Sequence, residues 1–321
     1  MWCVLLCPDG SLLASSSLDG SLRIWDLRAV RSALQLRTAD GADEGTPLTC
    51  DPSECCVLPM EEGVAIHSLS WTADGRYLLG CVTMTPIEIS RDGSHTGADV
   101  AEGGAVYCWA VNHGQSTARC DLTLLSTSRH HNGAVVSAKF IPSLLSSQVS
   151  PSLLPEKIDC ASLDCMSGLT LFVSAGETDD NILLCDAFFG TNLAELVERG
   201  PIRDILVLAP QGVCGSREVV KPAGLMLYIS NEAVVKLCRV ELCREDAAGG
   251  ETYYYRFVSV SAVTLPHPAL SLGADCEIGG ERHVIASLGG GHGCALLVVQ
   301  VGCFRCCLVS IWCFTLYIMA G

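Results

Sequence analysis

The chain has 321 residues, a formal net charge of −15 and a sequence pI near 4.8. Its length fits one large β domain or two small ones, and its 31 glycines and 13 prolines, spread between short apolar segments, suit the many turns of an all-β protein. The net negative charge argues against nucleic-acid binding through the overall electrostatic field of the protein, because phosphate contacts need a basic patch.

The first predicted elements are two strands and two tight turns near the N-terminus. Residues 8–10, Pro-Asp-Gly, form a turn signal, and residues 12–17 follow as an alternating strand. Asp19 and Gly20 predict a two-residue hairpin turn, and the return strand over 21–26 ends in the pair Trp25-Asp26. This order of turns and strands, closed by Trp-Asp, resembles a blade of a WD40 propeller.

Four more groups of predicted strands follow along the chain. The second group lies at 65–71, 77–83 and 105–109, and the third at 134–141, 169–175 and 181–186. The fourth lies at 202–208, 225–230, 233–240 and 253–261, and the fifth at 269–272, 284–288 and 294–301. The repeats predict an all-β, WD40-type β-propeller over residues 1–301 with about five recognisable blades.

A closed ring of this type usually has about seven blades. Either low-signal segments hide one more blade, or the ring is incomplete and open, with unpaired strand edges. The first blade starts so near Met1 that its outer strand is expected to be missing. We therefore expect either a shortened N-terminus or completion of the last blade by another segment.

Three insertions interrupt the predicted propeller. They cover about 39–63, which is acidic, 85–103, and 142–167, which is rich in Ser, Leu and Pro. Loops on a rigid scaffold are where binding sites are usually built. We expect these insertions to select partner peptides, and the acidic one either to steer a basic partner or to be solvated only.

The segment 302–321 is an apolar tail that breaks the repeat pattern. Its core, residues 306–319, has about 14 residues and is shorter than the ~20 that a membrane helix needs. Three interpretations remain open: an artefact of the gene model or of read-through, a membrane tail anchor, or a final strand pair buried in the propeller.

The 20 cysteines are expected to be reduced and mostly buried, because no secretory leader is expected before the first turn and no Asn-x-Ser/Thr acceptor occurs. Cys303 and Cys306 form a CxxC pair without a second ligand pair at regular spacing, so no metal is predicted. The glycine-rich segment 289–293 lacks the Lys-Ser/Thr ending of a phosphate loop and is predicted to be a hairpin turn. No cofactor is predicted.

The sequence contains no nucleophile-elbow motif, and the paired carboxylates Asp179 and Asp180 are expected to be solvated in a turn, so we predict no enzyme and no catalytic residues. His131 is expected to hydrogen-bond toward a hairpin Asp and to hold its blade together. The residues predicted to stabilise the blades are Asp19, Trp25, Asp26, Trp109, His131 and Asp186.

Four segments carry a closer resemblance. They are 18–32, 104–111 followed by His-Asn-Gly at 131–133, 171–184, and 258–272. The last contains the family-like residues Ser261, His267, Pro268, Leu270 and Ser271. In this order, over about residues 18–300, the segments resemble the propeller region of the Varicose-like enhancers of mRNA decapping.

That resemblance implies a non-catalytic scaffold in cytoplasmic mRNA decay, located in processing bodies. It implies protein partners, namely the decapping enzyme and its activators, with RNA contacted only indirectly, and self-association as a further property. The Ser-rich linker and C-terminal helical region of that family are not found in this sequence. Two alternatives stay open: a generic WD40 adaptor of another complex, and a tail-anchored propeller that acts as an exchange factor for a small GTPase.

Overall fold

The computed structural model describes most of the chain as β-structure. The described residues are 3–17, 20–28, 55–59, 64–84, 103–113, 120–142, 158–208, 219–230, 233–247, 250–265, 269–278, 281–290, 293–306 and 309–319. Their strands form five four-stranded antiparallel sheets, which we call blades one to five in chain order.

In the first two blades the strands are neighbours both in sequence and in the sheet. Blade one contains β1 (Cys3–Leu6), β2 (Leu12–Ser16), β3 (Ser21–Asp26) and β4 (Cys55–Pro59). Blade two contains β5 (Val64–Trp71), β6 (Tyr77–Met84), β7 (Gly104–His113) and β8 (Cys120–Ser128).

The other three blades have the same up-and-down order. Blade three contains β9 (Val135–Phe140), β10 (Leu171–Gly176), β11 (Asn181–Asp186) and β12 (Asn192–Val197). Blade four contains β13 (Ile202–Leu208), β14 (Val219–Ser230), β15 (Val234–Ala247) and β16 (Gly250–Thr264). Blade five contains β17 (Ala269–Ile278), β18 (Glu281–Gly290), β19 (Gly293–Cys306) and β20 (Val309–Met319).

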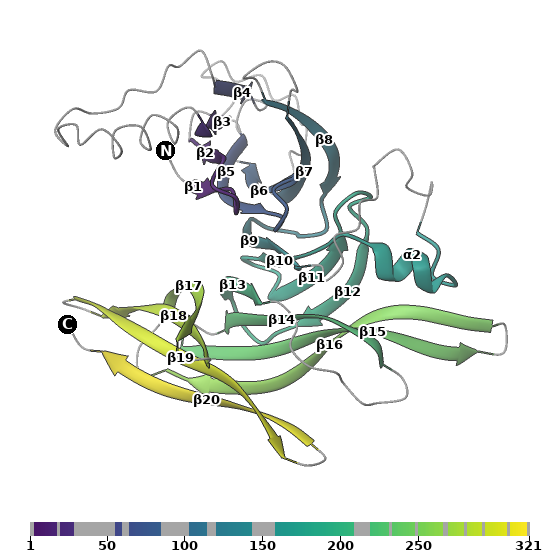
Figure 1. Ribbon diagram of the computed structural model, residues 1–321, viewed down its shortest axis with the longest axis vertical. Coiled ribbons are helices and arrows are strands. Elements are labelled where there is room, and N and C mark those ends of the chain that lie inside the picture. The colour runs from purple at the N-terminus through teal and green to yellow at the C-terminus, as the bar shows by residue number, and fades with distance from the viewer. Residues whose placement is uncertain are drawn as a thin grey trace, which may run out of the picture.

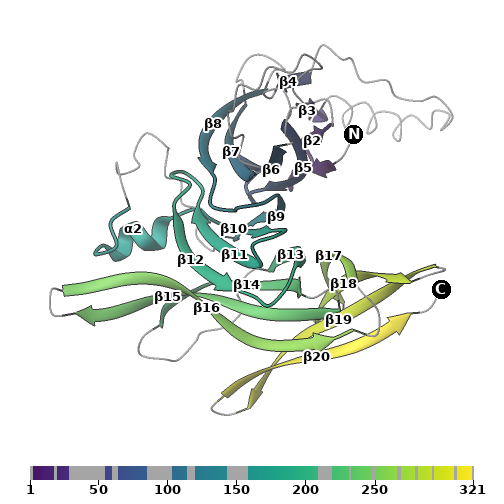
Figure 2. The same ribbon diagram turned by 180° about the vertical axis from the view of Figure 1, so that it is seen from behind.

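The blades follow one another along an arc. The first strands β1, β5, β9, β13 and β17 contact each other in that order. Figure 1 shows blade one at the top and blade five at the bottom of this arc, and Figure 2 shows the same separation from behind. The expected all-β propeller with about five blades is therefore confirmed, and its described residues form an open arc.

The face of blade one that points away from blade two is exposed, as an open arc requires. Val4, Leu6 and Val57 point away from blade two and are 43%, 52% and 51% exposed. The opposite face carries Leu12 and Leu22, which are fully buried against blade two. One side of blade one thus packs as an interior and the other faces solvent.

Apolar clusters lie between successive blades, because the side chains of a strand alternate between the two faces of its sheet. Leu78 packs into the cluster between blades one and two, whereas the next residue, Leu79, packs between blades two and three. Met226 and Leu227 divide in the same way between the interfaces with blades three and five. Each inner blade is buried on both faces.

Polar contacts also join neighbouring blades. In each contact the donor and the acceptor come from neighbouring blades or from the segment that joins them, so the contact fixes one blade against the next. They are Trp71 Nε1 to the Leu5 carbonyl (3.3 Å), Gly104 N–H to the Gly133 carbonyl (2.7 Å), Tyr228 and Lys236 to the Glu198 carboxylate, and Leu272 N–H to Asp204 Oδ2 (2.9 Å).

The expectation that blade one lacks its outer strand is wrong. The strand β4 lies within the segment 39–63 and pairs with β3 from Ser21–Pro59 to Trp25–Cys55, so the outer strand of this blade is present. This strand is only five residues long and lies within an acidic segment, which hid its apolar pattern. Sequence analysis also missed the outer strands β8 and β12, and the short helix α2 (Leu163–Gly168) within the insertion 142–167.

The described part of the tail is β-structure. β19 continues to Cys306, and β20 pairs with it from Leu296–Met319 to Cys306–Val309. Within the part of the chain that the structure describes, no helix combines the length and hydropathy needed to cross a membrane.

Cysteines contribute to the interior as small apolar residues. Cys81, Cys108 and Cys185 are buried with free thiols. Burial raises the pKa of each of these thiols to about 12, so they stay protonated near neutral pH. These three cysteines therefore serve packing.

Candidate protein-interaction site

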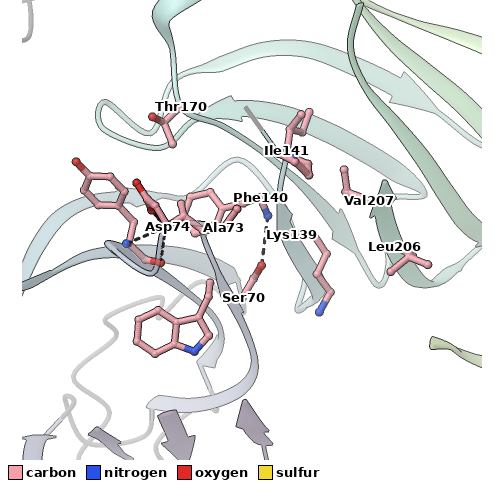
Figure 3. A pocket seen from close by; sticks show the side chains of 13 residues that line it. Ser70, Ala73, Asp74, Lys139, Phe140, Ile141, Thr170, Leu206 and Val207 are labelled. Carbon is pink, nitrogen blue, oxygen red and sulfur yellow. Dashed lines mark hydrogen bonds between the residues drawn. The ribbon is translucent and has the colours of Figure 1, made fainter. Parts of the chain in front are cut away.

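A pocket of about 320 Å³ lies where blades two, three and four meet, at the ends of their first strands. Trp71 and Tyr77 line it from blade two, Phe140 and Ile141 from blade three, and Leu206 and Val207 from blade four. Figure 3 shows Phe140 near the centre of these side chains, with Leu206 and Val207 on one side. The volume is at the lower end of the range for small-ligand sites.

The turn after β5 positions the blade-two wall of the pocket. Gly75 has φ +70° and donates its N–H to the Thr72 carbonyl, and Thr72 Oγ1 donates to Asp74 Oδ1 at 2.7 Å. A Cβ at Gly75 would lie 2.5 Å from Cys7 Sγ, so a glycine is needed there for space as well as for φ. The turn therefore forms a rigid edge of the pocket.

Two contacts join this edge to blade three. The Phe140 N–H donates to Ser70 Oγ at 3.3 Å, which holds the end of β9 against the end of β5 (Figure 3). The rings of Tyr77 and Phe188 pack edge to face at 5.1 Å. Burial raises the pKa of Tyr77, so its hydroxyl stays protonated near neutral pH.

Two charged side chains line the pocket, Asp74 and Lys139. Figure 3 shows them on opposite sides of Phe140, pointing away from each other. Asp74 is already engaged, since it accepts from Thr72 Oγ1 and the Arg76 N–H and lies 3.9 Å from Arg76 Nε. The apolar walls and these polar groups are suited to binding a ligand with both apolar and polar parts.

The predicted blade residues lie apart from this pocket. In blade one, Trp25 Nε1 donates to Ser15 Oγ at 2.9 Å, and Asp26 Oδ1 accepts from the Arg28 N–H at 2.9 Å. The hydrogen bonds that the Arg28 guanidinium donates to the Asp26 carboxylate raise the pKa of Arg28. Asp19 lies outside the described residues. Trp109, in blade two, is 1% exposed.

In blade three, His131 lies in a buried polar network. Its Nδ1 lies 2.8 Å from Asp179 Oδ2 and its Nε2 lies 2.9 Å from Ser174 Oγ. An ionised carboxylate can only accept, so Nδ1 is the donor to Asp179. The expectation that Asp179 is solvated is wrong, because its side chain is only 5% exposed.

Asp186 occupies the Trp-Asp position of blade three and is fully buried. Its Oδ1 accepts from the N–H groups of Phe188 and Phe189 at 2.9 and 2.8 Å. No side-chain or backbone donor of the described residues reaches Oδ2. Burial dominates and raises the pKa of Asp186 to about 6, although the backbone hydrogen bonds lower it in part.

A pH-dependent loss of stability follows from Asp186. Between about pH 4 and 6 the folded state keeps a proton that the unfolded state has released, so this group lowers the free energy of unfolding as pH rises. We expect the difference in the free energy of unfolding between the wild type and Asp186→Asn to fall by up to ~3 kcal/mol from pH 4 to pH 7. Urea unfolding at both pH values measures it, and a difference that stays constant contradicts it.

Three of the five residues of the family-like segment lie in strands. Ser261 lies in β16 opposite Leu237, and Ser271 lies in β17 opposite Ser287. Leu270 also lies in β17, whereas His267 and Pro268 are outside the described residues. The CxxC pair lies in β19. Among the described residues no group of three His, Cys, Asp or Glu side chains could hold a metal ion.

Comparison with known families gives a match at the N-terminus. Residues 1–26, which include the first three strands of blade one, match the model of the WD domain, G-beta repeat (WD40) family. The fold is a WD40-type β-propeller. Propellers of this type are in general non-catalytic scaffolds that present loops and pockets to other proteins.

Several solved structures are similar to the propeller. The structure of U3-55K has 12% identity, covers 94% of this chain and 77% of that chain, and gives a TM-score of 0.43. The RRP9 WD40 repeats have 12% identity, coverage of 94% and 76%, and a TM-score of 0.43. Saccharomyces cerevisiae Sqt1 has 11% identity, coverage of 92% and 80%, and a TM-score of 0.37. No curated protein matches the sequence.

The pocket could not be predicted from the sequence. Its walls come from the ends of β5, β9 and β13, which lie far apart along the chain. In each strand the lining residues read as ordinary core residues. The one available signal was Lys139, a charged residue in the otherwise apolar end of a predicted first strand.

Proposed function

We propose that this propeller is a non-catalytic scaffold for protein–protein interaction, and that the pocket between blades two, three and four binds a short segment of a partner protein. The pocket itself carries the proposal, because its rigid apolar walls lie beside polar groups that can orient a peptide. The hydrogen bond from the Phe140 N–H to Ser70 Oγ joins the blade-two and blade-three walls, so the pocket needs little rearrangement to accept a ligand.

We further propose that the scaffold acts in mRNA decapping and cytoplasmic mRNA decay, in processing bodies. Support comes from the resemblance of four segments, in this order, to the Varicose-like propellers: 18–32, 104–111 followed by 131–133, 171–184 and 258–272. The partners would be the decapping enzyme and its activators, with RNA reached through them and self-association as a further property. The alternatives are an adaptor of another complex and a tail-anchored exchange factor for a small GTPase.

Capture from a cytoplasmic lysate under native conditions tests both the role of the pocket in partner binding and the role of the scaffold in mRNA decapping. The bait is the tagged full chain, compared with Ala73→Trp, which fills the pocket from its exposed rim, and Ala262→Trp, a matched exposed site on β16. We expect immunoblotting to detect the decapping enzyme with the wild type and Ala262→Trp, and at least fivefold less with Ala73→Trp.

The other outcomes separate the alternatives. A bait that recovers no decapping factor but the stable subunits of another complex contradicts the decapping role and favours the generic adaptor. Carbonate-resistant membrane association that disappears on deletion of residues 302–321, with a small GTPase bound, favours the exchange factor. Equal recovery of the decapping enzyme with Ala73→Trp removes the pocket from the interaction.

A further inference from the structure

We propose that the pocket recognises a peptide segment in which a large apolar side chain is next to a carboxylate, with the carboxylate paired to Lys139. This inference rests on the proposed function, since it concerns the chemistry of the segment that the same pocket binds. It specifies an acidic partner segment, although the chain as a whole is strongly acidic.

The apolar part follows from the walls of the pocket. Trp71, Phe140 and Ile141 are each less than a tenth exposed, so they form a close-packed surface, and Leu206 and Val207 add aliphatic contacts from blade four. A volume of about 320 Å³ suits one large apolar side chain and part of its neighbour. An aromatic side chain removes the most apolar area from water in such a space.

The acidic part follows from Lys139. This side chain lines the pocket from β9, between the buried residues Ala138 and Phe140. Among the described residues no carboxylate lies within ion-pair distance of its ammonium group. By contrast, Lys236 of blade four is paired with the buried carboxylate of Glu198.

Asp74, the other charged side chain of the pocket, does not form an ion pair with Lys139. Asp74 is held by its own turn and by Arg76, and it lies on the far side of Phe140 (Figure 3). A positive charge beside apolar walls favours a ligand that brings a negative charge next to an apolar group. Since the net charge of the chain is −15, long-range attraction does not favour acidic peptides, and selectivity must come from this local contact.

Fluorescence anisotropy with labelled hexapeptides tests the assignment. The probes are Ser-Gly-Phe-Glu-Gly-Ser and three matched peptides, in which Gln or Lys replaces Glu, or Ala replaces Phe. We expect the wild type to bind the Phe-Glu peptide about tenfold more tightly than the Phe-Gln peptide, and the Ala-Glu peptide at least tenfold more weakly. Lys139→Ala is expected to abolish the preference for Glu over Gln.

Two further variants and a control complete the test. Lys139→Arg keeps the charge and is expected to keep the preference, whereas Lys139→Glu is expected to prefer the Phe-Lys peptide. Lys221→Ala removes a lysine of β14 that does not line the pocket and is expected to change nothing.

Different results would overturn the role of Lys139 and the proposed function. Equal binding of the Glu, Gln and Lys peptides by the wild type, lost in Ala73→Trp, overturns the role of Lys139 and leaves the pocket as a peptide site. Absence of binding to all probes, or binding that Ala73→Trp does not weaken, overturns this inference; the capture experiment then decides the proposed function independently. A preference for Glu that survives Lys139→Ala and Lys139→Glu also overturns the inference.

Discussion

Replacement of Trp109 by alanine is expected to lower the free energy of unfolding by about 3 to 5 kcal/mol, the largest effect of a single substitution that we predict. Trp109 is among the largest fully buried side chains and packs in the cluster between blades one and two. Its ring stacks on Tyr107 at 5.6 Å. Urea unfolding measures the change, with the slope m as a check on the compactness of the unfolded state.

A matched control lies on the neighbouring strand. Leu124 is the partner of Trp109 across β7 and β8, but it is 50% exposed. Leu124→Ala is therefore expected to cost less than about 1 kcal/mol. A loss below 1 kcal/mol for Trp109→Ala, with m unchanged, would contradict the assignment of the indole to the interior.

Gly80 offers a second check on the same site. A Cβ at this position would lie 2.7 Å from Trp109 Cζ3, so the glycine makes room for the indole. Gly80→Ala is thus expected to destabilise the wild type but to cost much less in Trp109→Ala, where the space is free. Additive costs in the double mutant would show that the two residues do not share this space.

The sequence predicted the fold where turn chemistry and strand alternation coincide. Residues 10–26 carry Gly10, Gly20 and the Trp-Asp pair, and both glycines have positive φ, at 71° and 75°. β4, β8 and β12 were missed because an outer strand contacts the sheet on one edge only and carries a weaker apolar pattern. In β12, for example, the exposed residues Asn192, Glu195 and Val197 leave little alternation to detect.

The buried polar network of blade three was, like the pocket, less predictable than the fold. Asp179 reads as half of a solvated carboxylate pair, and only the approach of His131, 48 residues away along the chain, shows that it is buried. Asp180, its neighbour, has φ 50° and turns the chain into β11. Long-range packing assigns different roles to two identical adjacent residues, and local sequence cannot distinguish them.

Replacement of Asp179 by alanine is expected to lower the free energy of unfolding by about 2 to 4 kcal/mol. The carboxylate accepts from His131 Nδ1 at 2.8 Å and from the Asn132 N–H at 3.2 Å, and its removal leaves the buried imidazole without this acceptor. The matched control is Glu177→Ala, an exposed carboxylate in the same loop, for which a change below about 0.5 kcal/mol is expected.

The double variant of Asp179 and His131 decides whether the hydrogen bond itself is responsible. If the imidazole and the carboxylate act as a pair, His131→Ala and Asp179→Ala together should cost clearly less than the sum of the single costs, with a coupling of about 1 to 3 kcal/mol. His131→Ala also removes the hydrogen bond with Ser174 Oγ, but this loss is common to His131→Ala and the double variant, so it cancels in the coupling. Strict additivity would mean that Asp179 stabilises blade three through its loop alone, and that the buried network has no cooperative part.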